Sequence, residues 1–286
     1  MSTTQPRLEE VVYSDLTWAE SPRSHDGIFW ISDTQGSRLI EIRPGGTLVH
    51  ELEAAVNGTS FLPNGDLVAA GMASQRVDRF HDGTWELHAD LAPLQAGRMG
   101  DMTTLSDGTI YVDALGAQNH DGPVDASGRI LKIDPDGNAS VAADGLVWPN
   151  GLALIDDSTT LVVAETFVKR LTAFTVGPDG SLSDRRLWLD LEAELGAEYM
   201  PDGLWPTRDG SVWAAATTGR AAVQTRQGEV VQKLDVDGFA IACCLDADER
   251  SLYVTVANSN DPAETVLAAV ARKQVHARVE RYSLTA

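Results

Sequence analysis

Short apolar runs preceded by polar turns recur along the whole chain. In each copy, a turn containing Asp, Asn or Gly leads into an apolar stretch that ends in small side chains, which is the pattern of a buried strand after a tight turn. The six copies are His25–Thr34, Pro63–Gly71, Ser106–Ala114, Asp156–Thr166, Arg208–Ala216 and Asp248–Ala257. Their equivalent positions are 39, 43, 51, 51 and 40 residues apart, and a period of this size indicates a repeat architecture.

Each copy also has a second half. Two more strand-like segments follow the first, joined by a glycine-containing turn such as "RPGG", "HDG", "DPDG", "GPDG" or "TRQG", which is typical of a hairpin. The sixth copy retains only "ARVERYSLTA" before the chain stops, and the N-terminal "RLEEVVYSDLTW" has the alternation of a strand. We expect the two ends to share one sheet, because this closes a ring and hides its edges.

Six units of this kind predict an all-β fold, a six-bladed β-propeller closed by the N-terminal strand. No Pro/Ser linker or break in composition divides the chain, so residues 1–286 are expected to form a single domain. A β-sandwich with helical additions is the competing fold, but it explains neither the number of units nor their shared internal order. Helix is expected only in "AELGAEYM" and within Asp261–Gln274.

The overall charge excludes some classes of partner. The chain has 22 basic and 42 acidic residues, a formal net charge of −20, whereas nucleic acids and anionic membrane surfaces bind basic patches. This charge favours solubility, and a field that attracts metal ions is the alternative. The N-terminus lacks the apolar core of a signal peptide, and no apolar run has the length of a membrane span. The adjacent Cys243 and Cys244 bridge only with strain and are expected to be buried thiols in a reducing cytoplasm.

Candidate chemistry lies just before the repeated strands. In a propeller, the segment that leads into the innermost strand of each blade lies near the central axis, so equivalent residues converge. Acids and amides recur there: Glu20, Asn57, Asp101, Asn150 and Asp202. Carboxylates together with an amide oxygen suit a hard divalent cation. Without a cation, the carboxylates of this set would repel one another and would lose their hydration.

Asn150 is informative because it does not serve a turn. Asn150-Gly151 is a common turn dipeptide, yet the turn at this point of the chain is expected at "DDST". We therefore expect Asn150 to direct its side-chain oxygen towards the axis and Gly151 to let the backbone pass close by. The familiar catalytic strings, such as H-E-x-x-H, G-x-S-x-G and the P-loop, are absent from the sequence.

Four short motifs resemble the senescence marker protein/gluconolactonase family, which includes regucalcin. They are "ESP" at Glu20–Pro22, "R-x-x-D…DG" at Arg98–Gly108, "PNGLA" at Pro149–Ala153 and "PDGL" at Pro201–Leu204. Each motif alone is weak, but four in the order of the family, one per expected blade, are specific. The resemblance covers nearly the whole chain. It implies a six-bladed propeller with one catalytic divalent cation on its axis, Ca²⁺ first, with Mg²⁺, Mn²⁺ or Zn²⁺ as alternatives.

The resemblance also implies roles for individual residues. It makes Glu20, Asn150 and Asp202 metal ligands, with Asp202 also the general base, and it places Asp101 beside the site as a second candidate base. Arg98 corresponds to a substrate-contacting arginine. The family usually has Asn two positions later, where this chain has Gly100. This departure weakens the assignment to sugar lactones and indicates a differently shaped or less polar substrate.

The expected activity is therefore the hydrolysis of a lactone by metal-activated water, with a small lactone or ester as the only partner. Residues expected to contact substrate are Arg98, Gly100, Trp148 and Trp205. Two alternatives remain: a hydrolase of open esters or phosphotriesters at the same site, and a non-catalytic metal-binding propeller. The physiological substrate, the identity of the metal and the oligomeric state stay open at this level.

Overall fold

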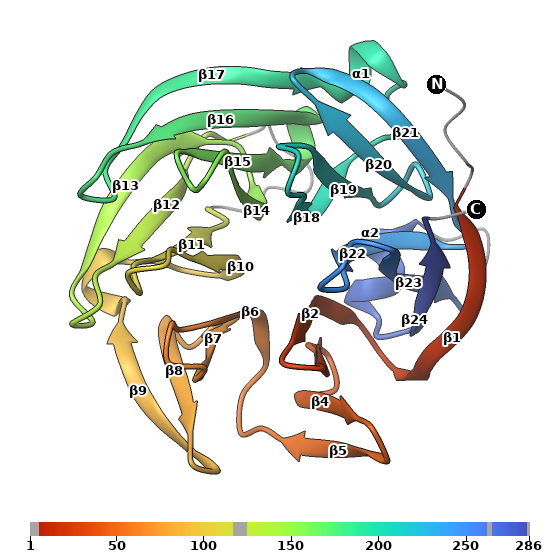
Figure 1. Cartoon of the computed structure of the whole chain (residues 1–286), viewed down its shortest axis with the longest axis horizontal. Helices are drawn as coiled ribbons and strands as arrows, with labels where there is room; N and C mark the ends of the chain where they lie inside the picture. The colour runs from red at the N-terminus through yellow and green to blue at the C-terminus, as the bar shows by residue number, and fades with distance from the viewer. Residues whose placement is uncertain (1–5, 117–124, 262–264, 285–286) are drawn as a thin grey trace.

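Six four-stranded antiparallel sheets form a ring around a central axis in the computed structural model, which describes residues 6–116, 125–261 and 265–284 (Figure 1). Blade 1 contains β2 (Ala19–His25), β3 (Ile28–Asp33), β4 (Arg38–Arg43) and β5 (Gly46–Glu51). Blade 2 contains β6 (Val56–Phe61), β7 (Leu67–Gly71), β8 (Arg76–His81) and β9 (Thr84–Asp90). Blade 3 contains β10 (Met99–Thr104), β11 (Ile110–Ala114), β12 (Gly128–Ile133) and β13 (Ala139–Leu146).

The remaining blades follow the same order from the axis outwards. Blade 4 contains β14 (Pro149–Ile155), β15 (Thr160–Glu165), β16 (Arg170–Val176) and β17 (Leu182–Asp190). Blade 5 contains β18 (Pro201–Pro206), β19 (Val212–Ala216), β20 (Ala221–Arg226) and β21 (Glu229–Asp235). Blade 6 contains β22 (Phe239–Leu245), β23 (Ser251–Ser259), β24 (Val275–Ser283) and β1 (Arg7–Leu16). The fold predicted from the repeat is confirmed.

The two ends of the chain meet in blade 6, as expected. Strand β1 pairs antiparallel with β24, with Leu8 opposite Tyr282 and Leu16 opposite Ala277, and Figure 1 shows the first strand lying beside the last. This pairing gives the short sixth repeat its fourth strand, and the ring closes through backbone hydrogen bonds rather than a covalent link. The edge that the last repeat would otherwise expose is thereby covered.

Helix is scarce in the described residues. The helical segments are η1 (Ala92–Leu94), η2 (Thr166–Val168), α1 (Leu191–Glu194) and α2 (Val266–Ala271). The last of these lies within the predicted helical segment, whose residues 262–264 fall outside the described ones. No helix in the described part of the chain has the length and apolar character needed to cross a membrane.

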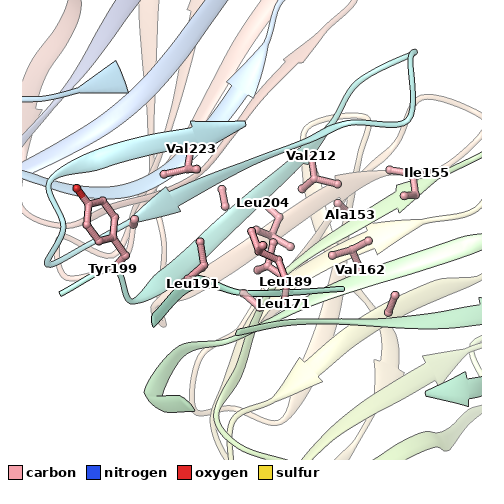
Figure 2. Packing of buried hydrophobic residues seen from close by; sticks show 14 of the residues in the cluster. Ala153, Ile155, Val162, Leu171, Leu189, Leu191, Tyr199, Leu204, Val212 and Val223 are labelled. Atoms are coloured by element: carbon pink, nitrogen blue, oxygen red, sulfur yellow. The ribbon is translucent and has the colours of Figure 1, made fainter. Parts of the chain in front are cut away.

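The hydrophobic core lies between neighbouring blades. Between blades 4 and 5, for example, Val162 and Leu171 lie on one side and Leu204 and Val212 on the other, all of them buried (Figure 2). The small side chains of the inner strands, such as Ala214, allow the sheets to approach closely. The adjacent Cys243 and Cys244 are buried and unbridged in the innermost strand of blade 6. Each blade buries its apolar faces only against its neighbours, so the ring stabilises itself as a whole.

Candidate active site

A bulge interrupts the first strand pair of every blade near the axis. The register shifts lie between Glu20 and Arg23 in blade 1, between Pro149 and Leu152 in blade 4 and between Pro201 and Leu204 in blade 5. The other three blades have the same irregularity at the corresponding position. A bulge re-aims a side chain without ending the strand. The residues that the repeat aligned therefore fall where the backbone can turn them towards the axis.

Glu20, Asn150 and Asp202 line one cavity of about 460 Å³. They come from β2, β14 and β18, the innermost strands of three blades. All three lie at the starts of their strands, so the cavity opens on the face of the ring where these strands begin. The ring thus brings together residues that are 130 and 52 positions apart in the sequence.

Asp202 is held by two hydrogen bonds. Asn150 Nδ2 donates to Asp202 Oδ1 over 2.6 Å, and Thr217 Oγ1 donates to Asp202 Oδ2 over 2.8 Å. Burial, together with the charge of the nearby Asp101, outweighs the lowering effect of these hydrogen bonds and raises the pKa of Asp202 to about 7. Such a carboxyl group can both release and accept a proton near neutral pH.

Glu20 shares this environment. Its Oε1 accepts a hydrogen bond from Trp18 Nε1 over 2.8 Å. Burial raises the pKa of Glu20 well above its usual value, and the charge of Asp202 adds to the effect. A buried acid whose pKa is raised further by a second buried acid is in an environment that a bound cation would relieve.

Gly151 permits the close packing that places Asn150 beside Asp202. A Cβ atom at Gly151 would lie 2.3 Å from the carbonyl oxygen of Asp202 and 2.4 Å from the amide nitrogen of Leu204. No side chain fits there, because both atoms belong to the backbone of the next blade. The glycine of "PNG" therefore lets β14 approach β18, as its place in the sequence suggested.

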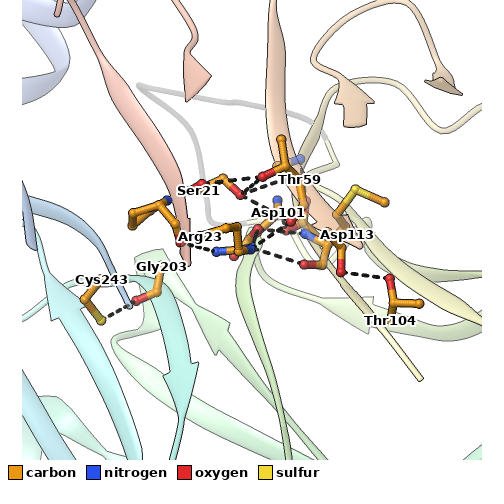
Figure 3. A network of polar contacts seen from close by, with 12 residues as sticks. Ser21, Arg23, Thr59, Asp101, Thr104, Asp113, Gly203 and Cys243 are labelled. Carbon is orange, nitrogen blue, oxygen red and sulfur yellow. Dashed lines mark hydrogen bonds and ion pairs between the residues drawn. The ribbon is translucent and has the colours of Figure 1, made fainter. Parts of the chain in front are cut away.

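Asp101 is not among the residues that line this cavity and belongs instead to a polar network with Arg23 and Thr59 (Figure 3). Its Oδ1 accepts a hydrogen bond from Arg23 Nη2 over 2.7 Å, and the two side chains are 10% and 8% exposed. Arg23 also donates to the carbonyl oxygen of Thr59 over 2.8 Å and lies over the ring of Trp205. Asp101 and Arg23 thus form a buried ion pair. This position suits a residue that acts on its neighbours through its charge.

Asp113 is a buried acid that the sequence pattern did not single out. Its two carboxylate oxygens accept hydrogen bonds from the backbone N–H groups of Gly100 and Asp101, over 2.6 and 2.7 Å. Burial raises its pKa well above the usual value, and the charges of Asp101 and Asp202 contribute. Its signal in the sequence is weaker than that of the acids in "WISD" and "VVAE": those strands end in an acid, whereas in "IYVDA" the acid stands one residue before the strand end.

The acids at the ends of the other two strands have a different environment. Asp33 is paired with Arg38, and Glu165 with Arg170. Although burial opposes the shift, hydrogen bonds from these arginines and from nearby hydroxyl and backbone donors lower the pKa of both acids. Asp113 bonds to β10 itself, nearer the axis, and belongs electrostatically to the site.

The structure places the four residues expected to contact substrate in three different surroundings. Arg98 and Trp148 line the cavity with the acids. Gly100 lies beneath it, bonded to Asp113. Trp205 lies instead in a second cavity of about 200 Å³ with Arg23 and Phe61. That cavity is formed by the far ends of the innermost strands, so Trp205 faces the opposite mouth of the ring.

The donors at the first cavity fit a hard divalent cation. Glu20, Asn150 and Asp202 present oxygen atoms only, and both carboxyl groups are destabilised as anions by burial. No group of three or more His, Cys, Asp and Glu side chains in the described ranges is placed to hold a metal by itself. The candidate set therefore depends on the amide of Asn150, and water would have to complete the coordination shell.

The chain is similar to a known protein family and to a known lactonase over most of its length. The family model described as SMP-30/Gluconolactonase/LRE-like region matches residues 18–258. The chain is 23% identical over 263 residues to the pentonolactonase XacC of Haloferax volcanii, an alignment that covers 88% of this chain and 86% of that protein.

Two solved structures share the fold. The calcium-binding protein regucalcin from Agrobacterium tumefaciens superposes with a TM-score of 0.75 at 19% identity, covering 98% of this chain and 95% of that one. A gluconolactonase from Xanthomonas campestris superposes with a TM-score of 0.73 at 23% identity, covering 99% and 95% of the two chains. At these identities the structural likeness speaks for the fold alone.

Proposed function

The chain belongs to the SMP-30/gluconolactonase/LRE-like family, and from this premise we propose that it is a hydrolase that opens a lactone with water. The observation that carries the proposal is the meeting of Glu20, Asn150 and Asp202, from three blades, in one cavity. Two relatives named for lactone hydrolysis, the pentonolactonase and the gluconolactonase, support the same reaction.

Glu20, Asn150 and Asp202 would hold a divalent cation, with Ca²⁺ first among the candidates because every donor is an oxygen atom. When bound, such an ion polarises a carbonyl group and lowers the pKa of water. The calcium-binding relative supports this choice. Burial of the two carboxyl groups also means that the folded protein has free energy to gain from a cation there.

Asp202 is the proposed general base. Its hydrogen bonds from Asn150 and Thr217 orient the carboxylate, and a carboxylate held in this way can accept a proton from an adjacent water. Asp202 accepts a proton from water as the water oxygen bonds to the acyl carbon. The ring C–O bond then breaks, and the leaving alkoxide takes up the proton, so that the product is a hydroxy acid. Asp101 is the alternative base and otherwise tunes the site through its charge.

The decisive experiment combines substrate, metal and mutation. We expect a panel of lactones, open esters and a phosphotriester to show lactone turnover, which chelation abolishes and a divalent cation restores. Asp202→Asn should lower kcat by at least about 100-fold because a positioned base contributes that much, while Asp136→Asn, at an exposed turn, should not. Activity that survives complete metal removal would refute the metal-dependent mechanism. Cation binding with no turnover of any substrate would favour a binding propeller instead.

A further inference from the structure

The cavity around Glu20, Asn150 and Asp202 has largely apolar walls. Its acids come from the innermost strands, whereas large hydrocarbon and sulfur-containing side chains from several blades surround them. These wall residues include Trp18, Met72, Trp148, Phe167, Met200 and Phe239. Helix α2 of blade 6 adds Val266 and Val270. A cavity of about 460 Å³ falls in the size range of small-ligand sites.

Several polar wall atoms are already engaged within the protein. Thr217 Oγ1 donates to Asp202, and Thr218 Oγ1 donates to the carbonyl oxygen of Glu198. Thr265 Oγ1 accepts from the N–H of Ala268 at the start of α2. Asn57 Oδ1 accepts from the hydroxyl of Thr34. These groups have less capacity for new hydrogen bonds than their number suggests.

Gly100, which lies beneath the cavity, contributes no side-chain hydrogen-bond donor. A side chain there would meet the carboxylate of Asp113, whose oxygens are in turn occupied by two backbone N–H groups. The remaining cationic donors of the wall are Arg98 and Arg220, and the guanidinium of Arg220 lies over the ring of Phe239. Planar guanidinium groups match a carboxylate such as the hydrolysis product, rather than a row of separate hydroxyl groups.

We propose that this site takes lactones that carry a hydrocarbon substituent, aliphatic or aromatic, in preference to polyhydroxylated sugar lactones. The inference rests on the proposed hydrolase function and deepens it. The reactive ester group lies over Glu20, Asn150 and Asp202, and its substituent packs against Trp148, Phe167 and α2. A sugar lactone would bury several hydroxyl groups against these walls with few partners, and each unpaired group disfavours binding.

A homologous series of γ-lactones tests the proposal. With side chains from methyl to hexyl, kcat/KM should rise about fourfold per methylene group until the cavity is filled, and a sugar lactone should be the poorest substrate. A flat series, or a sugar lactone that matches the hexyl lactone, would overturn the inference and leave the hydrolase function standing. Absence of turnover for every lactone would overturn the proposed function itself.

Substitution of one wall residue gives a second test. Val270→Thr keeps the size of the side chain and places a hydroxyl in the wall, so kcat/KM for the hexyl lactone should fall roughly threefold to tenfold, while the methyl lactone is little affected. Val141→Thr makes the same change on an exposed outer strand and should alter neither. An equal loss for both lactones in Val270→Thr, with unchanged thermal stability, would show that the substituent does not pack on α2 and would contradict the proposed placement.

Discussion

The carboxylate of Asp113 occupies the space that a side chain at position 100 would need. A Cβ atom on Gly100 would lie 2.6 and 2.9 Å from the two carboxylate oxygens, which bond instead to the backbone N–H groups of Gly100 and Asp101. The glycine and the buried acid therefore depend on each other.

This relationship predicts that substitutions at Gly100 and Asp113 have coupled effects on stability. Gly100→Ala should destabilise the protein by about 1–3 kcal/mol, because the new methyl group displaces the Asp113 carboxylate from its two donors. The same change in an Asp113→Ala background should cost less, which a double-mutant cycle of urea denaturation measures. Gly46→Ala, where nothing lies within 4 Å of the added carbon, is the matched control. Strict additivity of the two substitutions would contradict the coupling.

The buried ion pair between Arg23 and Asp101 gives a second prediction. Arg23→Met leaves the buried Asp101 carboxylate without its cation and should cost about 3–5 kcal/mol. The double variant Arg23→Met/Asp101→Asn should recover part of this loss, since it removes the charge that lost its partner. Thermal unfolding of the single and double variants measures both effects. If the double variant is no more stable than Arg23→Met, the loss comes from the other contacts of Arg23 instead.

The raised pKa values predict how the metal-free protein responds to pH. The pKa of Asp202 is about 7 in the folded protein against a reference of 3.8, so between these values the folded state holds a proton that the unfolded state has lost. Stability is then fully present below about pH 4 and falls as pH rises towards 7, by up to about 1.4 kcal/mol per pH unit for this group. The raised pKa values of Glu20 and Asp113 act in the same direction.

The measurement is the unfolding free energy of chelated protein across pH 5 to 8. Under the proposed cation site, saturating Ca²⁺ at pH 8 should restore the stability that deprotonation removes, because a ligand of the folded state alone stabilises it. Asp33 and Glu165 have lowered pKa values, so their contribution is lost only as pH falls below the usual range of carboxyl groups. Stability of the chelated protein that rises from pH 5 to 8 would contradict the assignment of these buried acids.

The hydrogen bond from Thr217 to Asp202 predicts how the activity depends on pH. Its hydroxyl donates to Asp202 Oδ2 over 2.8 Å and lowers the pKa of that carboxyl. Thr217→Val removes the donor at nearly constant volume, so the limb on which kcat/KM rises with pH should move to higher pH. Thr159→Val, at an exposed turn, should leave the profile in place. A uniform loss of activity with no displacement of the limb would indicate that Thr217 supports the fold only.

The sequence repeat predicts much of this architecture, because turns and apolar strands are encoded by residues that are close together in the sequence. Six Asp/Gly turns at spacings of 39 to 51 residues specify six blades, and the alternation in the N-terminal strand anticipates its pairing with β24. Equivalent offsets in a ring converge on its axis. For this reason the sequence alone predicts that Glu20, Asn150 and Asp202 lie close together.

What the tertiary structure alone decided was which neighbours each of these residues meets. Trp205 stands three residues beyond Asp202, the proposed ligand that it was expected to accompany, yet strand pleating and the length of β18 carry it to the opposite mouth. Asp113 is the next-to-last residue of a short apolar strand and becomes part of the site only because β11 packs beside β10. The local sequence pattern determines where the chain turns and which strand faces are apolar. Contacts across strands and blades depend instead on register and packing. Those contacts set the pKa values of the buried acids and form the walls of the cavity.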